Sequence, residues 1–471
     1  MKELGSIGKN TAWQIFGKGL GTAISMVSVF FIIRLLGPAN YGTFALLTTI
    51  MNLFYMLSGL GFEQSMPYFL SKYKNSQLDL IKKFLKARGV LIILASLVLF
   101  LSVNFIADYY GNAELKSYLP WIALSMPVFI IMNNAPHILQ GLNNLKTTSI
   151  ADLIFNIAKI AAIPLIIYFS IYGGIMGYFI AYAAYSVYAY KKISELSKSK
   201  NKKFDKYGDF AKFSLVNYAG TIIVFLYLYL LPLILGKFPV ELGYLDASGR
   251  VGTILTLFST ALFTALIPGI VGKKVEEIRN VSSKIINYVL IYLVPLLAFF
   301  LFASNFATEF LLGSEFSSIY MIIQIVSVAN FFNIFCGFFE SISYSVGKNK
   351  YNVIGYLLRL IIVVIFSAYA INAFNVSLIF LGAAFANFIF ISIKSRKYYS
   401  IDLRAAGKIL AFCLPLILFF AIDMNIILKI AGSAVSSAVY LFLIWKKVLD
   451  NEDRGLFRKF YLKLKGIIFK N

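Results

Sequence analysis

The chain has 471 residues, of which 59% are hydrophobic and 14% are charged. Soluble globular proteins carry about 25% charged residues, so this composition excludes that class and requires lipid as the solvent for much of the surface. The formal net charge of +23 does not indicate nucleic-acid binding, because the basic residues lie between apolar stretches rather than on one basic face with interleaved aromatic residues. Cys336 and Cys413 both stand inside apolar segments, so they form no metal-ligand pattern.

Apolar stretches long enough to cross a hydrocarbon core of about 30 Å recur along the whole chain. The first follows the N-terminal segment without a small-residue cleavage site, so we expect that segment to stay attached. The pattern predicts an all-α membrane protein of about fourteen helices. In order they cover residues 9–33, 42–70, 84–107, 117–140, 149–170, 174–190, 210–235, 247–271, 283–304, 317–340, 351–372, 376–393, 407–422 and 426–445.

Lysine and arginine are abundant in every second loop. With the N-terminus inside the cell, the inner segments hold 36 of the 44 basic residues, the outer loops hold 5 and the spans hold 3. The five in outer loops are Arg34, Lys116, Lys237, Arg250 and Lys429. Because cytoplasmic loops are enriched in Lys and Arg, both termini are predicted to be cytoplasmic in a multi-pass protein of the plasma membrane.

A basic stretch from Lys191 to Lys206 divides the first twelve predicted helices into six and six. We expect it to be a solvated, orientation-setting loop, with contacts to anionic lipid as a minor addition. The predicted organisation is an N-terminal lobe (1–195), a cytoplasmic linker (196–206), a C-terminal lobe (207–398), helices 13 and 14 (399–447) and a basic cytoplasmic tail (448–471).

A weak internal repeat supports two lobes. Residues 34–48 and 233–248 each place Leu-Gly before a short polar link and a small-residue, aromatic helix start, and residues 139–150 resemble 345–354. Both correspondences have the same offset of six helices and the same orientation. They favour a parallel repeat, in which the lobes are related by an axis along the membrane normal.

Three basic residues, Lys18, Lys159 and Arg359, fall inside predicted spans. A charge at the bilayer centre costs about 2.5 to 3.5 kcal/mol on insertion scales, so it normally faces protein or a water-filled cavity. At 1.5 Å per residue each lies roughly 10 to 16 Å from the cytoplasmic start of its helix, which is too deep for easy snorkelling. They are therefore candidate functional residues.

Polar residues recur at helical spacing on several predicted spans, so that these helices share one polar side. A water-filled compartment would satisfy all of them. The predicted lining residues are Gln14, Asn52, Asn133, His137, Gln140, Asn156, Asn330 and Asn333. For His137, which is the single histidine, a satisfied imidazole near the membrane interface is the alternative to a proton relay.

Internal ion pairs are the alternative interpretation of the charged residues, because charges within a membrane often pair with one another. A pair that lines a cavity could serve both purposes. The candidate pairs are Lys18 with Glu63, Lys159 with Asp152 through Asn156, and Arg359 with Glu340.

Patterns for other chemistry are absent from the sequence. It has no GxxxxGK[ST] phosphate loop, no HExxH and no conspicuous nucleophile elbow. The outer loops are too short for an extracytoplasmic catalytic domain. We therefore predict a transporter rather than an enzyme, without a bound cofactor, and coupled to a gradient for which H+ and Na+ are the candidate ions.

Residues 7–73 resemble the start of polysaccharide-biosynthesis membrane proteins, which are the O-antigen and lipid-linked oligosaccharide flippases of the multidrug/oligosaccharidyl-lipid/polysaccharide exporter superfamily. The residues that carry the resemblance are Leu35, Leu36, Gly37 and Pro38 with Tyr41 and Gly42, followed by Gly59, Gly61, Glu63 and Gln64. The resemblance implies two six-helix lobes in a V-shaped arrangement like that of multidrug and toxin extrusion (MATE) transporters, plus two C-terminal helices.

The resemblance also implies alternating access and a polyprenyl-phosphate-linked or polyprenyl-diphosphate-linked glycan as substrate. Lys18, Lys159 and Arg359 would contact its anionic headgroup, since phosphate charges need such partners in a low-dielectric cavity. Their partners and coupling groups would be Glu63, Asp152 and Glu340. We expect a monomer surrounded by membrane lipids, with glycan-assembly enzymes as candidate partners.

Three other functions are alternatives to a polysaccharide flippase. MATE drug exporters usually carry an acidic cation-binding residue in the first helix, whereas this helix has Lys18 and no acidic residue after Glu3. Lipid II flippases share the fourteen-helix plan. A membrane glycan polymerase or ligase would need a large outer loop, which this chain lacks.

Overall fold

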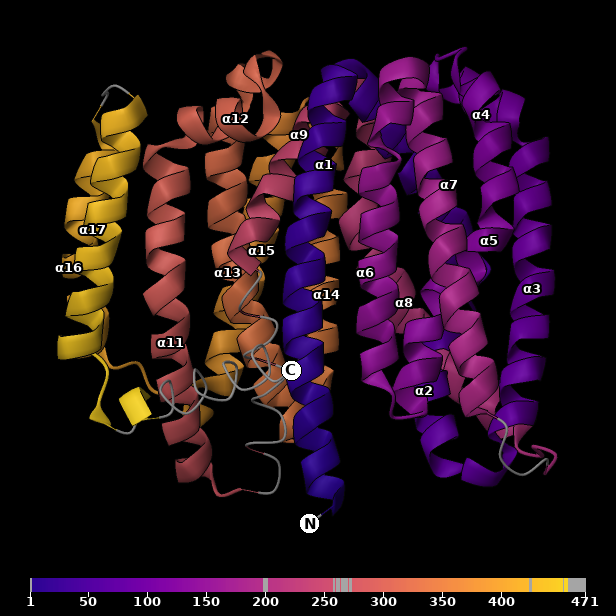
Figure 1. The fold of residues 1–471 in the computed structure, drawn as a ribbon, viewed down its shortest axis with the longest axis horizontal. Coiled ribbons are helices and arrows are strands. Elements are labelled where there is room, and N and C mark those ends of the chain that lie inside the picture. Colours follow the sequence, from indigo (N-terminus) through magenta and orange to yellow (C-terminus); the bar gives the residue numbers. More distant parts are fainter. Residues whose placement is uncertain are drawn as a thin grey trace, which may run out of the picture.

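The computed structural model describes residues 2–197, 202–256, 273–422, 426–451 and 453–455, together with the single positions 259, 263 and 270. Side chains are described from Gly21 onward within these ranges, except at 426, 427, 429 and 430. The described segments consist of helices and short connections, without a strand, and the long helices run roughly parallel (Figure 1). This confirms the predicted all-α class.

Figure 1 labels the elements used below. The helices are α1 (Lys2–Leu57), α2 (Phe62–Lys72), α3 (Gln77–Leu101), α4 (Val103–Tyr110), α5 (Leu115–Gly141), α6 (Leu145–Ala161), α7 (Ile163–Leu196), α8 (Tyr207–Leu235), α9 (Pro239–Gly252), α11 (Val275–Phe302), α12 (Ser304–Leu312), α13 (Tyr320–Ser345), α14 (Lys350–Ile365), α15 (Ala373–Ser395), α16 (Leu403–Ala421) and α17 (Ile426–Lys447). Short 3-10 turns are η1 (Lys74–Ser76), η2 (Thr253–Thr256), η3 (Ser314–Ile319), η4 (Ser367–Tyr369) and η5 (Arg396–Tyr398).

The helices have the dimensions of membrane spans. Within the described part of the chain, nine helical stretches are long and apolar enough to cross a bilayer by length and composition. The protein is therefore a multi-pass membrane protein, while the number fourteen stays a prediction. We call the end with the few Lys and Arg the outer end, uppermost in Figure 1, and the opposite end the inner end.

The outer turn predicted between the first two spans is present, but the second span is interrupted. The outer turn between them lies at Gly37 (φ 67°, ψ 173°), whose non-helical backbone separates two helices within α1, and Pro38 follows it. The second predicted span then breaks between Leu57 and Phe62, where Gly61 has a φ of 71°. Positive φ suits glycine because it has no Cβ. The sequence pattern did not reveal this break, because the apolar periodicity continues across it.

The two predicted sets of helices occupy different sides of the molecule (Figure 1). Helices α2 to α7 gather on one side and α11, α12, α13 and α15 on the other, and the part of α1 before Gly37 stands between them. The pair α16 and α17 covers the edge beyond α11. The Tyr440 hydroxyl of α17 donates a hydrogen bond to the Ile291 carbonyl of α11 at 2.7 Å. The lobe boundaries themselves stay a prediction.

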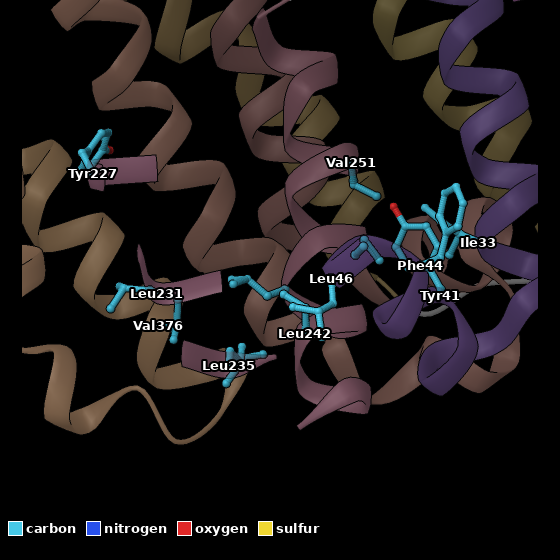
Figure 2. Packing of buried hydrophobic residues seen from close by; sticks show 14 of the residues in the cluster. Ile33, Tyr41, Phe44, Leu46, Tyr227, Leu231, Leu235, Leu242, Val251 and Val376 are labelled. Atoms are coloured by element: carbon cyan, nitrogen blue, oxygen red, sulfur yellow. The ribbon is translucent and has the colours of Figure 1, made fainter. Parts of the chain in front are cut away.

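Helix α8 contacts both sets of helices. In its inner half, Ser214 Oγ donates to Ser65 Oγ at 2.8 Å and the Tyr218 hydroxyl donates to the Leu57 carbonyl at 3.1 Å. Its outer half contributes Tyr227 and Leu231 to the buried core beside α15, as Figure 2 shows. One apolar core therefore continues across both lobes.

The chain between α7 and α8 is fixed to the inner end of the first set of helices. Phe204 is 2% exposed and packs edge-on against Tyr73, with ring centroids 5.3 Å apart. The Asp79 carboxylate accepts from the Phe204 backbone N–H at 2.9 Å and from the Tyr207 hydroxyl at 3.0 Å. Part of the predicted solvated linker is thus docked, because an aromatic residue stands among its lysines.

Replacing this buried aromatic residue should release the linker. Phe204→Ala removes contacts worth about 3 to 5 kcal/mol in a packed site, so limited trypsin digestion should cut the chain into two halves faster than in the unmodified protein. Tyr190→Ala, at a position that is 53% exposed, is the matched control. Equal cutting rates for both variants would show that Phe204 does not hold the linker.

Candidate substrate cavity

Two adjoining hollows lie inside the helix bundle, with volumes of about 280 Å³ and about 230 Å³. Both are lined by Asn52 of α1 and Asn133 of α5. These shared walls make them two compartments of one cavity, which we call the outer and inner compartments. A polar interior of this kind satisfies the amides that the sequence placed on the polar sides of the helices.

Lys159 of α6 lines the outer compartment. Its ammonium group donates to Ser25 Oγ at 3.0 Å and lies over the ring faces of Phe155, at 5.4 Å, and Tyr178, at 5.7 Å. A hydroxyl and two aromatic faces stabilise a cation without neutralising it. Among the described residues these are the polar contacts of Lys159, so its positive charge is available to an anion in the compartment.

A second cation reaches the same compartment from the other lobe. Arg250 of α9 lines it together with Asp246 and Tyr41. Arg250 Nε lies 3.1 Å from Asp246 Oδ2, and the Tyr41 hydroxyl donates to the same carboxylate. The Arg250 side chain keeps 49% of its surface accessible, because it borders the compartment rather than packing against protein. Its remaining donors can therefore bind a ligand.

The inner compartment is lined by amides, aromatic rings and one carboxylate. Beyond the shared asparagines it includes Glu63, His137, Tyr218 and Tyr229. Tyr218 and Tyr229 belong to α8, so this compartment also lies between the two sets of helices. Aromatic faces with amide and hydroxyl groups suit a polar organic ligand, because the rings cover its apolar side and the polar groups bond its edges.

Glu63 is held by an arginine that the sequence analysis missed. Arg88 Nη2 of α3 lies 2.6 Å from Glu63 Oε1, and Arg88 is fully buried. Arg88 Nη1 also donates to the Ser58 carbonyl, which the break between α1 and α2 leaves without a helical partner. Tyr55 adds a hydroxyl bond to Glu63 at 3.2 Å. This ion pair therefore stabilises irregular backbone beside a cavity, where membrane proteins tolerate it.

Five of the predicted site residues in the N-terminal half border the two compartments. The residues that line the two compartments are Asn52, Glu63, Asn133, His137 and Lys159. Gln140 lies instead in a separate groove at the inner end, beside Lys74 and Asn143. Asn156 is buried against α1, where its amide donates to the Gly21 carbonyl at 3.0 Å, so helix packing uses the group that we predicted for the cavity.

The C-terminal half of the predicted lining is placed elsewhere. Arg359 is buried between helices, with Nη2 at 3.8 Å from Glu340 Oε1 and at 2.7 Å from the Asn387 amide oxygen. The predicted pair with Glu340 is therefore present, but neither residue lines the two compartments. The reason is that a buried guanidinium needs a carboxylate and several acceptors, and three packed helices supply them.

Two further predicted positions, Asn330 and Asn333, also lie on α13 away from the two compartments. Asn330 donates to the Val326 carbonyl of its own helix at 3.0 Å, and Asn333 is half-buried. Asp152 is half-buried on α6 and is absent from the described lining of both compartments. The side chains of Gln14 and Lys18 lie outside the described residues. The predicted pairing of Glu63 with Lys18 therefore stays a prediction, while Arg88 is a partner of Glu63 that the prediction did not include.

Arg250 and Arg88 were missed because both were counted with loops. Helix α9 begins at Pro239 and α3 at Gln77, so each arginine lies eleven residues, or roughly 16 Å, inside a helix. The sequence contains signals that place both arginines inside helices. Pro239 is a favourable first helical residue and Asp246 and Arg250 have i, i+4 spacing, while Arg88 continues the apolar face of Leu80 and Phe84 at the same spacing.

The comparisons with known proteins decide the family. A model of the polysaccharide biosynthesis protein family matches residues 7–272. The chain belongs to this family. No curated protein sequence matches it. The sequence resemblance to polysaccharide-biosynthesis membrane proteins of the exporter superfamily is thereby confirmed.

Solved structures show the fold. A structure titled lipid II flippase MurJ, inward closed conformation, has a TM-score of 0.72 at 16% identity and covers 90% of this chain and 97% of its own. An inward-facing multidrug resistance MATE family transporter has a TM-score of 0.59 at 12% identity, covering 79% and 94%. A mutant form of the Vibrio cholerae MATE transporter VcmN has a TM-score of 0.56 at 14% identity, and the match covers 83% of this chain and 98% of the VcmN chain. The fold is thus that of flippases and transporters of this superfamily.

The buried ion pair beside the cavity gives a stability prediction. Arg88→Ala leaves Glu63 uncompensated, which costs about 3 to 5 kcal/mol for a buried pair, so the thermal midpoint in detergent should fall. The double variant Arg88→Ala with Glu63→Gln should recover part of the loss, because no lone charge remains. Lys86→Ala, at an exposed position of the same helix, should have little effect. An unchanged midpoint in Arg88→Ala would contradict the assignment.

Proposed function

We propose that this protein is a flippase that moves a polyprenyl-linked oligosaccharide across the plasma membrane by alternating access. The observation that carries the proposal is that Lys159 and Arg250 border one compartment from different lobes. Family membership and the fold shared with a lipid II flippase support it. Cargo of this class has a phosphate or diphosphate between its lipid and its glycan, and it is too polar there to cross hydrocarbon unaided.

The two cations have complementary roles toward a phosphate. A guanidinium offers a planar fork of donors that matches two phosphate oxygens, while an ammonium group acts as a compact point charge. Charge-assisted bonds of this kind are strong where water is scarce. The amides and aromatic rings of the inner compartment would then hold the first sugar residues, since they offer both edge bonds and apolar faces.

The remaining parts of the proposal concern energy and surroundings. We propose coupling to H+ or Na+ through a carboxylate that faces the cavity, for which Glu63 and Asp246 are the candidates among the described residues. Both termini would be cytoplasmic, because the basic loops are at the inner end. A monomer that receives its cargo from glycan-assembly enzymes would suffice, since both compartments are formed by one chain.

Lipid II transport is the second candidate, supported by the structural similarity to MurJ. This function would require the same kind of anion site. The cargo would differ from the proposed one in its glycan. Drug export predicts the opposite charge preference. A deletion strain separates the three functions, because accumulated lipid-linked oligosaccharide, accumulated lipid II and new drug sensitivity are different phenotypes.

Removing either cavity cation should impair flipping. With each charge-assisted bond worth about 1.5 to 3 kcal/mol, Lys159→Gln and Arg250→Gln should each lower the rate at limiting substrate on the order of tenfold to hundredfold. The measurement is complementation of the deletion strain together with the amount of lipid-linked oligosaccharide on the cytoplasmic leaflet. Lys116→Gln, an exposed lysine paired with Asp108 at the outer end, is the control.

The result that overturns the anion site is specific. If Lys159→Gln, Arg250→Gln and the double variant all complement fully at normal expression, no cavity cation is needed by the cargo. Lys159→Arg and Arg250→Lys are the charge-retaining variants for comparison. Partial activity in these two, with loss in the glutamine variants, is the expected pattern for an electrostatic role.

The coupling proposal has its own measurement. In proteoliposomes with a fluorescent short-chain lipid diphosphate sugar, an imposed H+ or Na+ gradient should accelerate flipping in the unmodified protein. Glu63→Gln or Asp246→Asn should abolish this acceleration, because an amide neither binds a proton at neutral pH nor carries the charge that attracts Na+. Equal acceleration in both variants would contradict coupling through these carboxylates.

A further inference from the structure

Backbone meets backbone between the two sets of helices at the outer end. Helix α1, just after its kink, crosses the start of α9 so closely that a methyl group on Gly42 would overlap the Pro239 carbonyl. In the same way, a methyl group on Gly243 would overlap the Pro38 carbonyl. Each glycine thus faces the carbonyl of the residue that precedes the other glycine by four. The contact is reciprocal.

The sequence of this contact is repeated in the two lobes. Pro38 and Gly42 stand four residues apart, as do Pro239 and Gly243, and these positions lie within the repeated segments 34–48 and 233–248. Small residues at such spacing let two helix backbones meet in a membrane, where Cα–H groups can contact carbonyl oxygens. The Leu46 and Leu242 side chains lie together at this crossing (Figure 2).

The crossing is continuous with the outer compartment. Tyr41, beside Gly42, donates its hydroxyl to Asp246, which lies one turn beyond Gly243 on α9. Arg250 is one further turn along and is bound to the same carboxylate. Lys159 faces the compartment from α6, which packs against α1. The relative placement of α1 and α9 therefore sets the separation of the two cations.

We propose that the anion site is divided between the lobes and exists only while the Pro38–Gly42 and Pro239–Gly243 segments are in contact. Opening the outer end would part α1 from α9, carry Arg250 and Asp246 away from Lys159 and Tyr41, and release the phosphate. This inference rests on the proposed function and adds to it how release is achieved. Neither cation needs to lose its charge. Once the helices part, the phosphate can no longer contact Lys159 and Arg250 at the same time.

The reciprocal glycines allow the contact to be opened without touching a charge. Gly42→Ala or Gly243→Ala introduces a Cβ where backbone already lies, so the helices must separate. Gly249→Ala is the matched control, because it lies on the same helix α9 and a Cβ there would have no neighbour within 4 Å. It is outside the crossing and absent from the lining of both compartments.

The first experiment measures anion binding by the full-length protein in detergent. Farnesyl diphosphate should raise the thermal midpoint of the unmodified protein and of Gly249→Ala above the value with farnesol, which has the same tail without the charge. Gly42→Ala and Gly243→Ala should lose this diphosphate-specific shift. Tyr41→Phe, which removes one hydroxyl and keeps the packing, should reduce it and serves if the glycine variants fold poorly.

The second experiment measures opening of the outer end in cells. Thr48 lines the outer compartment, so a Thr48→Cys reporter should react several-fold faster with a membrane-impermeant maleimide from outside when Gly42→Ala is added. The same reporter with Gly249→Ala should react slowly. The parent protein should stay unlabelled, because Cys336 and Cys413 are buried.

The outcomes separate this inference from the proposed function. If Lys159→Gln and Arg250→Gln retain the diphosphate-specific shift, the anion site itself is wrong. If those variants lose the shift but folded Gly42→Ala, Gly243→Ala and Tyr41→Phe all retain it in full, the anion site stands and its division between lobes is refuted. Loss of the shift in Gly249→Ala as well would also count against the crossing, since any glycine would then have the same effect.

Discussion

The cost of placing a charge in hydrocarbon governs this molecule. Each charged group deep in the bundle must find a counter-charge, a set of hydrogen-bond acceptors or water. Arg88 and Arg359 are paired with glutamates among packed helices. Lys159 borders a hollow without a carboxylate partner among the described residues, and Arg250 borders the same hollow while bound to Asp246. The same physical constraint therefore produces structural pairs in some places and a candidate binding site in another, and burial alone does not distinguish them.

Arg88 shows how irregular backbone is kept inside a membrane protein. The break after Leu57 frees the Ser58 carbonyl, and Arg88 binds this carbonyl together with Glu63. The break in turn places Gly61 against α8, close to the Ser214 carbonyl. A discontinuous helix at the side of a cavity is a recurring arrangement in transporters. Here it also provides the surface on which the inner half of α8 packs.

The two lobes contribute unequally to the cavity, although the sequence repeat treats them alike. The N-terminal lobe supplies α1, α2, α5, α6 and α7 to the walls, whereas the described C-terminal lobe supplies α8 and α9. The repeat is expressed most directly at the outer crossing, where the proline and glycine of each lobe meet those of the other. A single anion in the adjoining outer compartment would be shared by both lobes. Occupancy of the anion site would therefore depend on the relative position of the lobes.

The sequence by itself determined the membrane class, the helical fold and the family, because the periodicity and length of apolar stretches are local properties and residues 7–73 carry a recognisable pattern. A polar stripe on a mostly apolar helix must face away from lipid, but the stripes did not separate the residues that border the cavity (Lys159, Asn52, Asn133, His137 and Glu63) from those that do not (Gln140, Asn156, Asn330 and Asn333). Only the tertiary structure decided that Arg88 pairs with Glu63, that Arg359 is held by Glu340 and Asn387, and that Arg250 joins Lys159. Those choices depend on which helices meet and at what depth, and a one-dimensional pattern does not contain that information.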